Sequence, residues 1–224
     1  MPALRATIVF MVNIRSRWKL LLPALLILSM GALAFGQETP IQVRDSSVLK
    51  PPPGAKIALV EFMDLECPVC GHYNPIIEGA VAKYKLPWIH YSFPLPEHNW
   101  SFPAAVYAQW FQAKSYDLGN EYRNFIYANQ FNIETKSDLR NWTEKFAQQK
   151  KIALPFAIDP QGTYAAKVKA DMALGDRMGV YYTPTLWIVT NDYSHGKNYV
   201  QVTNFYDLYS MLDQAEARVG NKIP

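Results

Sequence analysis

Cys67 and Cys70 are the only cysteines in this chain of 224 residues, and they stand three positions apart. A disulfide that closes so short a loop constrains little of the unfolded chain, so it would add little stability. A chain with no further cysteine does not depend on a disulfide framework either. The pair therefore indicates chemistry rather than structural cross-linking.

The residues around the pair predict a strand, a turn and a helix. Residues 57–63 form a short apolar run, typical of a strand buried in a central sheet. A helical pattern follows to about Lys85, and Pro75 is expected to kink it. Cys67 then lies just before a helix N-terminus, where free N–H groups favour a thiolate. We expect Cys67 to be the nucleophile and the more buried Cys70 to resolve the mixed disulfide.

The rest of the chain alternates between strand patterns and one long helical block. Ser137 and Asp138 suit N-caps, Asn204 suits another, and Gly179 suits a helix stop. Aromatic residues at helical spacing within the block, Phe131 among them, are expected to form its core. The predicted strands are 88–93, 185–190 and 199–203, and the predicted helices are 104–114, 120–129, 137–150, 161–178 and 205–219. This order predicts an α/β fold.

Glu61 lies inside the apolar run, six residues before Cys67. A carboxylate in such a place is costly unless it is paired, and burial should raise its pKa. We expect it beneath the dithiol, where it can exchange a proton with Cys70 as the mixed disulfide resolves. The alternative is a glutamate on an edge strand that faces water.

Pro184 opens the predicted strand at 185–190, directly after Thr183. A cis X–Pro bond usually lies in a tight turn, and such a turn would present the Thr183 backbone to a substrate beside the cysteines. The alternative is an ordinary trans proline at a strand start.

A Cys-x-x-Cys motif can also be half of a zinc site, which needs four ligands. The candidates for the remaining ligands are histidines, and no second pair of residues has ligand spacing. We therefore expect no metal, although His72 lies close to the cysteines. The four histidines are His72, His90, His98 and His195.

The first 36 residues have the pattern of an export segment. Four basic residues and no acidic one precede an apolar run at 20–33, and Ala32 and Ala34 give the A-x-A spacing of a cleavage site. We expect a signal peptide or, alternatively, a membrane anchor, although the run is shorter than the ~20 residues that a spanning helix needs. Both place the remainder outside the cytoplasm, where disulfides persist. The polar, Pro-rich residues 37–56 are expected to form a tether.

The net charge of +3 belongs to this N-terminal segment. Without its four basic residues, 18 basic residues face 19 acidic ones. The rest of the chain therefore gives no support to nucleic-acid binding, which needs a basic face on the folded domain. Half of all residues are hydrophobic, which is ample for a packed core.

Taken together, these residues resemble the thioredoxin superfamily and, within it, the DsbA-like branch with an inserted helical domain. The resemblance runs from about Ile57 to Val219. It is carried, in order, by Val60-Glu61-Phe62, Cys67-Pro68-Val69-Cys70, Pro75 and Thr183-Pro184-Thr185.

The resemblance implies a thioredoxin fold with a central mixed sheet, built from residues 57–97 and 179–224, and an all-helical insertion at 98–178. It implies that substrates bind at Thr183, Pro184, Pro68 and Val69. Val69 stands where the strongest oxidases of this branch have histidine, and Glu66 adds a negative charge next to Cys67. Both should raise the pKa of Cys67 relative to such an oxidase.

The implied activity is that of an exported thiol–disulfide oxidoreductase without a cofactor. Its partners would be unfolded or cysteine-containing exported proteins and a membrane redox partner, and the chain is expected to be a monomer. The insertion favours a dithiol oxidase, with reductase or isomerase as alternatives. Two other classes stay open: a metal-delivery protein that uses Cys67, Cys70 and His72, and a non-catalytic module that holds unfolded chains.

Overall fold

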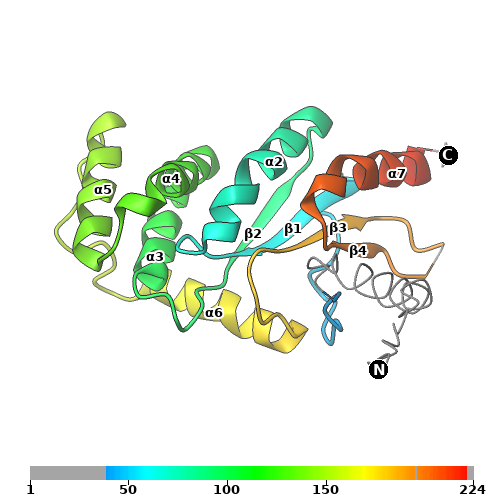
Figure 1. Ribbon diagram of the computed structural model, residues 1–224, viewed down its shortest axis with the longest axis horizontal. Helices are drawn as coiled ribbons and strands as arrows, with labels where there is room; N and C mark the ends of the chain where they lie inside the picture. Colours follow the sequence, from blue (N-terminus) through cyan, green and yellow to red (C-terminus); the bar gives the residue numbers. More distant parts are fainter. Residues whose placement is uncertain (1–38, 195, 221–224) are drawn as a thin grey trace, which may run out of the picture. The chain divides into compact units, whose positions relative to one another are not determined.

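A computed structural model describes residues 39–194 and 196–220. In this part of the chain a four-stranded mixed sheet has helices on both faces (Figure 1). The strands are β1 (Ile57–Met63), β2 (Trp88–Ser92), β3 (Thr185–Thr190) and β4 (Tyr199–Val202). The helices are α2 (Pro68–Tyr84), α3 (Ser101–Gln112), α4 (Tyr116–Asn129), α5 (Lys136–Gln149), α6 (Thr163–Met178) and α7 (Leu208–Gly220), with 3₁₀ turns η2 (Gln130–Asn132) and η3 (Phe205–Asp207). The predicted α/β thioredoxin fold with inserted helices is confirmed.

The strands are ordered β2-β1-β3-β4. β1 pairs parallel with β2 and antiparallel with β3, and β3 pairs antiparallel with β4. Every residue of β1 and of β3 is buried, which agrees with the apolar runs that predicted them. The central strands therefore carry the core, while β2 and β4 form the edges.

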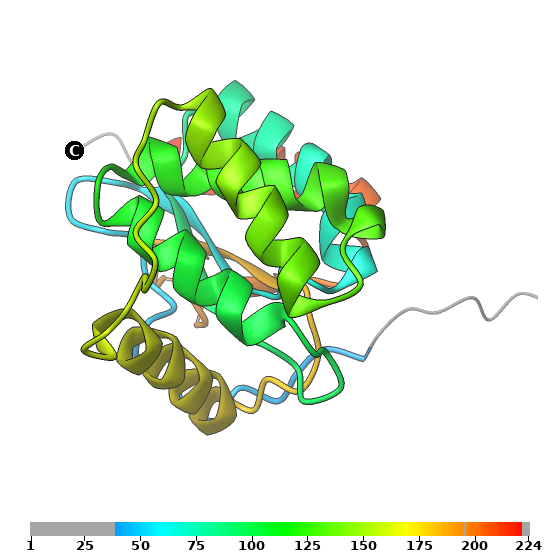
Figure 2. The same cartoon turned by 90° about the vertical axis from the view of Figure 1, so that its left-hand side faces the viewer.

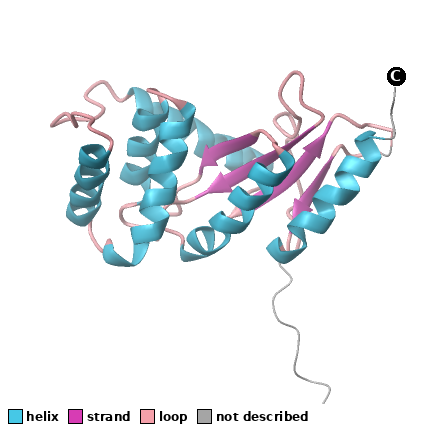
Figure 3. Ribbon diagram, turned by 90° about the horizontal axis from the view of Figure 1, so that it is seen from above, coloured by secondary structure: helices cyan, strands magenta, loops and turns pink. Residues whose placement is uncertain are grey.

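Alternate residues of β1 face different helical layers. Ile57 and Leu59 pack with residues of α2 and α7, whereas Ala58, Val60 and Phe62 pack with residues of α6. Figure 3 looks onto the layer that α2 and α7 form over the strands. Since side chains alternate along a strand, Glu61 points to the same face as Leu59, beneath α2.

The helices α3, α4 and α5, which follow β2 and precede β3 in the sequence, lie side by side (Figure 2). Their buried side chains form a second hydrophobic core. The rings of Phe111 and Phe146 meet edge to face at 5.0 Å between their centroids. Cys67 and Cys70 belong to the same buried cluster, so this core reaches the cysteine pair. The expectation for Phe131 was wrong, because its side chain is 87% exposed at the turn η2.

Side-chain caps explain where the helix starts differ from the sequence prediction. α4 begins four residues early because the Ser115 side chain accepts a hydrogen bond from Leu118 N. Thr135, rather than Ser137, caps α5 in a capping box with Asp138, which is the third residue of the helix. Asn204 caps η3 as expected, accepting from Tyr206 N.

Two further predictions concerned Gly179 as the end of a helix and Pro75 as the site of a kink. Gly179 has a φ of 91° and ends α6, in agreement with the sequence. α2 continues as one helix across Pro75.

The residues expected to form a tether pack partly on the domain. Ile41 and Leu49 are buried on the face of the sheet that α6 covers. Arg44 N donates to Met178 O at 3.1 Å, and Ile41 N donates to the Gln201 side chain at 2.7 Å. The described part of segment 37–56 therefore differs from a free spacer, because apolar side chains inside it can leave water by packing on the sheet.

The predicted export segment, residues 1–36, lies outside the described residues. No helix in the described part of the chain combines the length and hydropathy needed to cross a membrane.

Gly175 on α6 allows close packing of that helix on the sheet. A Cβ atom there would lie 2.5 Å from Phe93 Cε2 and 3.1 Å from Phe62 Cε1, both on buried rings. We predict that Gly175→Ala lowers the free energy of unfolding, because overpacking costs about 1–3 kcal/mol against a helix-propensity gain of up to about 1 kcal/mol. Urea unfolding measures this. The matched control, Gly220→Ala, meets no atom within 4 Å, and an equal loss there would contradict the explanation.

Candidate active site

Cys67 lies at the N-cap position of α2. Its backbone is extended, with φ −71° and ψ 118°, and no side-chain hydrogen bond caps this helix. Pro68 follows at the start of the helix, where its missing N–H costs nothing. The sulfur therefore stands where a capping oxygen would, close to the free N–H groups of the first turn. The predicted helix N-terminus at the cysteine pair is thus present.

The pKa values of the two thiols are shifted in opposite directions. A hydrogen bond from the Cys70 thiol and others from the backbone N–H groups of Val69 and Cys70 lower the pKa of Cys67 to about 6, although burial opposes the shift. Burial is the main cause that raises the pKa of Cys70 well above its ordinary value, and the hydrogen bond to Cys67 adds to this shift. Cys67 is 5% exposed and Cys70 is 1% exposed. Cys67 is therefore the thiolate near neutral pH, and Cys70 is a buried thiol.

The loop before β3 meets Cys67 from the other side. The Thr183–Pro184 peptide bond is cis. Cys67 Sγ lies 3.3 Å from the Thr183 carbonyl oxygen, 116 residues away in the sequence, and the protonated form of the thiol can donate a hydrogen bond to it. Thr183 and Pro184 are buried, whereas Pro68 and Val69 are exposed beside them on the helix. The structure thus brings together the four residues that we expected to contact substrate.

Glu61 lies on the face of β1 that α2 covers. It is 3% exposed, and its carboxylate accepts a hydrogen bond from Trp88 Nε1 at 2.9 Å. Burial raises its pKa to about 7, although the Trp88 hydrogen bond and the charge of Arg123 oppose the shift. Its charge in turn contributes to the raised pKa of Cys70. The alternative of an edge-strand glutamate facing water is therefore wrong.

Asp64 was missed as a site residue. Its buried carboxylate receives hydrogen bonds from Glu66 N at 2.8 Å, Leu95 N at 2.8 Å, His98 Nδ1 at 2.7 Å and the Ser101 hydroxyl. Its carbonyl oxygen also accepts from Cys67 N at 3.2 Å. Asp64 therefore fixes the turn that ends at Cys67. In the sequence, only the polar character of the residues after β1 pointed to a structural role for Asp64.

Glu66 and His98 surround this turn. The Glu66 carboxylate accepts from Asn99 N at 3.1 Å and from Trp100 N at 2.6 Å, at the start of α3, so part of its charge is balanced there. Burial works against protonation of His98, but its hydrogen bond with Asp64 and the Asp64 charge exceed that effect and raise its pKa. The hydrogen bond with Asp64 thus gives His98 a structural role at this turn.

Gln130 is a second residue that the sequence did not reveal. Its side-chain amide donates to Leu65 O at 2.8 Å and to Cys67 O at 3.0 Å. A Cβ atom on Gly71 would lie 2.9 Å from Gln130 Oε1, so glycine allows this contact. The inserted helices therefore hold the backbone of the cysteine motif directly.

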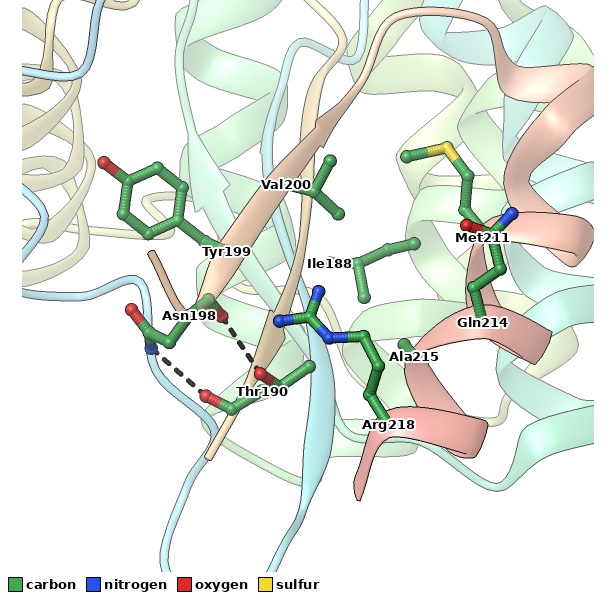
Figure 4. Close-up of a pocket in the computed structure, with 9 residues that line it drawn as sticks. All are labelled: Ile188, Thr190, Asn198, Tyr199, Val200, Met211, Gln214, Ala215 and Arg218. Carbon is green, nitrogen blue, oxygen red and sulfur yellow. Dashed lines mark hydrogen bonds between the residues drawn. The ribbon is translucent and has the colours of Figure 1, made fainter. Parts of the chain in front are cut away.

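Within the described part of the chain, neither a metal-binding cluster nor the pocket between β4 and α7 provides a second candidate active site. Among the described residues, no three His, Cys, Asp or Glu side chains are grouped to hold a metal. His72 lies 3.4 Å from the Tyr206 hydroxyl and so has a partner other than a metal. A pocket between β4 and α7 is lined by Ile188, Val200 and Met211, with Arg218 as its one charged residue (Figure 4). It contains neither cysteine and offers no reactive group.

The comparisons with known proteins agree with this geometry. The thioredoxin family model matches residues 52–207. No curated protein sequence matches the chain. Solved structures with a similar fold include α-DsbA1 of Wolbachia pipientis, at 18% identity and a TM-score of 0.63, covering 78% of this chain and 93% of that one. DsbA2 of Pseudomonas aeruginosa has 16% identity and a TM-score of 0.54, with 78% and 95% covered. The thiol-disulfide exchange protein α-DsbA2 of W. pipientis has 19% identity and a TM-score of 0.56, with 74% and 84% covered.

The sheet with its inserted helices, the cysteine pair at a helix N-terminus and the Thr183–Pro184 loop against that pair give the chain a DsbA-like thioredoxin fold. The chain belongs to the thioredoxin family. The resemblance predicted from the sequence is confirmed.

The hydrogen bond from Cys70 is the largest cause of the low Cys67 pKa. We predict that Cys70→Ala raises the pKa of Cys67 from about 6 toward its ordinary value, whereas Cys70→Ser, which keeps a donor, raises it less. The rate of iodoacetamide alkylation against pH measures the change. Equal midpoints in both variants and the wild type would show that Cys70 does not stabilise the thiolate.

Proposed function

We propose that this protein is an exported oxidoreductase that exchanges disulfides with unfolded or cysteine-containing exported proteins, most readily as a dithiol oxidase. Cys67 is the nucleophile, Cys70 resolves the mixed disulfide, and Glu61 exchanges the proton of Cys70. The observation that carries the proposal is the Cys67 sulfur, which has a pKa of about 6 and lies 3.3 Å from the Thr183 carbonyl of the cis-proline loop. The similar α-DsbA2 is described as a thiol-disulfide exchange protein.

In the oxidase direction, a substrate thiolate attacks Cys67 Sγ of the Cys67–Cys70 disulfide. Cys70 leaves as a thiolate and takes a proton, which Glu61 can supply because its pKa is about 7. A second substrate thiolate then attacks the substrate sulfur of the mixed disulfide and releases Cys67. The low pKa of Cys67 makes it a good leaving group. The substrate gains a disulfide, and the enzyme is left as a dithiol.

The acidity of Cys67 bears on the direction of electron flow. A stabilised thiolate favours the reduced enzyme and so makes the disulfide form an oxidant. The pKa of about 6 lies between the values of about 3.5 for the strongest oxidase and about 7 for thioredoxin. This agrees with the expected effect of valine at position 69, and it supports a milder oxidant than that oxidase.

Exposed apolar side chains beside the cysteines support unfolded chains as substrates. Val69 is 48% exposed within the motif itself, and Tyr181, two residues before Thr183, is 65% exposed. Tyr206, 67% exposed, lies 3.4 Å from His72 on α2. Apolar segments of an unfolded protein can bury these groups, while Thr183 and Pro184 contact the backbone next to the substrate cysteine.

The cellular setting follows from the sequence. The charged and apolar pattern of residues 1–36 supports export, either with cleavage or with retention as an anchor. A dithiol oxidase must lose its electrons after each turnover, so we propose a membrane protein as its redox partner. The enzyme works as a monomer in this proposal.

One prediction of this proposal concerns the redox potential of the Cys67–Cys70 pair. For a chain without residues 1–36, equilibrated with glutathione buffers, we expect a value between about −120 mV, typical of the strongest oxidase, and about −270 mV, typical of thioredoxin. The intermediate Cys67 pKa is the reason. Mass spectrometry of alkylated samples measures the reduced fraction.

The control is the double variant Cys67→Ser, Cys70→Ser, which should exchange with neither form of glutathione. A potential at or below about −270 mV would reverse the proposed direction to a reductase. A wild-type protein that forms no disulfide at any glutathione ratio would overturn the oxidoreductase proposal.

The second prediction concerns Glu61 as the proton acceptor. Reduced protein mixed with glutathione disulfide forms a Cys67–glutathione disulfide, which Cys70 then resolves. We expect the rate of resolution to rise with pH through about 7, as Glu61 ionises. Glu61→Gln should remove this rise and slow resolution at pH 8 by about 100-fold. Acid-quenched flow separates the two steps, and an unchanged profile in Glu61→Gln would exclude the role.

A further inference from the structure

Arg123 on α4 is a buried cation. It is 2% exposed, and its guanidinium donates to Asn120 Oδ1 at 3.1 Å and to Gln112 Oε1. Its Nε is buried and has no hydrogen-bond partner among the described residues. Neither partner amide carries a charge, so the cation is not neutralised by direct contact. A buried, unpaired charge is costly, which calls for another reason for its presence.

The face of α4 that carries Arg123 is joined at its two ends to the edge strand β2 and to the turn after β1. Tyr116, Asn120, Arg123 and Tyr127 follow one another at spacings of four, three and four residues, so they share one face of the helix. At one end, the Tyr116 hydroxyl donates to Trp88 O; at the other, the Tyr127 hydroxyl donates to Asp64 O at 3.4 Å. Arg123 lies between these two anchor points.

Glu61 lies between the same two points on the sheet. It precedes Asp64 by three residues in the sequence, and its carboxylate binds Trp88 Nε1. Trp88, Tyr116 and Asn120 line part of one pocket between β2 and α4, although neither Glu61 nor Arg123 lines it. The hydrogen-bond partner of Glu61 and a hydrogen-bond partner of Arg123 therefore border the same space.

Arg123 provides the positive charge that acts on Glu61. Its charge lowers the pKa of Glu61, against the larger opposing effect of burial. His90, opposite Glu61 on β2, stays neutral because burial and the Arg123 charge hold its pKa well below the ordinary value. The other titratable groups that interact with Glu61 or Arg123 are Cys67 and Cys70 on α2, Tyr116 and Tyr127 on α4, and Asp171 on α6.

We propose that Arg123, supplied by the inserted helices, is a positioning residue that acts through Glu61 and sets the pH range in which Cys70 gives up its proton. The proposal rests on the role of Glu61 in the proposed function. In the step concerned, the Cys70 thiol passes its proton to the Glu61 carboxylate. The Cys70 sulfur then attacks Cys67 Sγ, the Cys67–Cys70 disulfide forms, and glutathione leaves as a thiolate. Glu61 afterwards releases the proton to solvent.

The test compares two variants of the same position. Arg123→Met removes the charge, whereas Arg123→Lys keeps it, and both lose the geometry of the guanidinium. With glutathione disulfide as the probe, we expect Arg123→Met to move the midpoint of the resolution rate upward by about one pH unit. Arg123→Lys should retain a midpoint near that of the wild type. A purely structural role would lower the melting temperature of both variants and leave both midpoints unchanged.

A double-variant comparison separates the two proposals. In a Glu61→Gln background, Arg123→Met should cause no further change in the pH profile. If the midpoint depends on Glu61 but not on the charge at position 123, the inference about Arg123 fails and the proposed function stands. If the wild type forms no disulfide with glutathione disulfide, both fail.

A measurement without turnover covers the case in which Arg123→Met reacts too slowly. Infrared titration of the protonated Glu61 carboxyl band, assigned with Glu61→Gln, reports the same midpoint directly. It should rise in Arg123→Met and not in Arg123→Lys, and an unshifted band in Arg123→Met would overturn the inference.

Discussion

The buried carboxylate of Asp64 joins the two halves of this protein at the point where its chemistry takes place. It receives hydrogen bonds from the turn after β1, from the segment after β2 and from the first residue of α3. A buried carboxylate is tolerated only when such donors surround it, and hydrogen bonds to a charged acceptor are about twice as strong as neutral ones. Because Cys67 N donates to the carbonyl of the same residue, the position of the nucleophile depends on this junction.

The inserted helices are therefore part of the active site as well as a cover for it. Gln130 binds the carbonyl groups of Leu65 and Cys67, and Tyr127 binds that of Asp64. Both cysteines lie in the buried cluster that the insertion shares with the end of β1. In this cluster the cysteines lie together with buried aromatic side chains of the insertion. Burial raises the pKa of Cys70, while the hydrogen bond that Cys70 donates is the main cause of the lowered pKa of Cys67.

The sequence predicted what depends on neighbouring residues and missed what depends on distant ones. A strand, a cysteine motif and a helix lie within thirty residues of one another, so Cys67, Cys70 and the burial of Glu61 were readable from local patterns. Gln130 and Arg123 act on the site from about sixty positions away, and nothing near them in the sequence marks the hydrogen bond of Gln130 to Leu65 or the effect of the Arg123 charge on Glu61. The packing of Ile41 and Leu49 on the sheet was not predicted for a related reason, since these two apolar residues stand in a segment whose composition is polar and Pro-rich.

The polar groups beneath the cysteines lower the free energy of unfolding, but they include an acid, Glu61, whose pKa is about 7. Glu61 and Arg123 are buried and His90 is half-buried, and His90 Nδ1 and Arg123 Nε have no hydrogen-bond partner among the described residues. Apolar residues of similar size would pack there at lower cost. An apolar core, however, has no group that can take the proton of a thiol as buried as Cys70. Burial raises the pKa of a carboxyl, and both the Trp88 hydrogen bond and a cation supplied from α4 counteract that rise for Glu61. In the proposed function, the balance of burial against the Trp88 hydrogen bond and the Arg123 charge keeps Glu61 able both to accept and to release a proton.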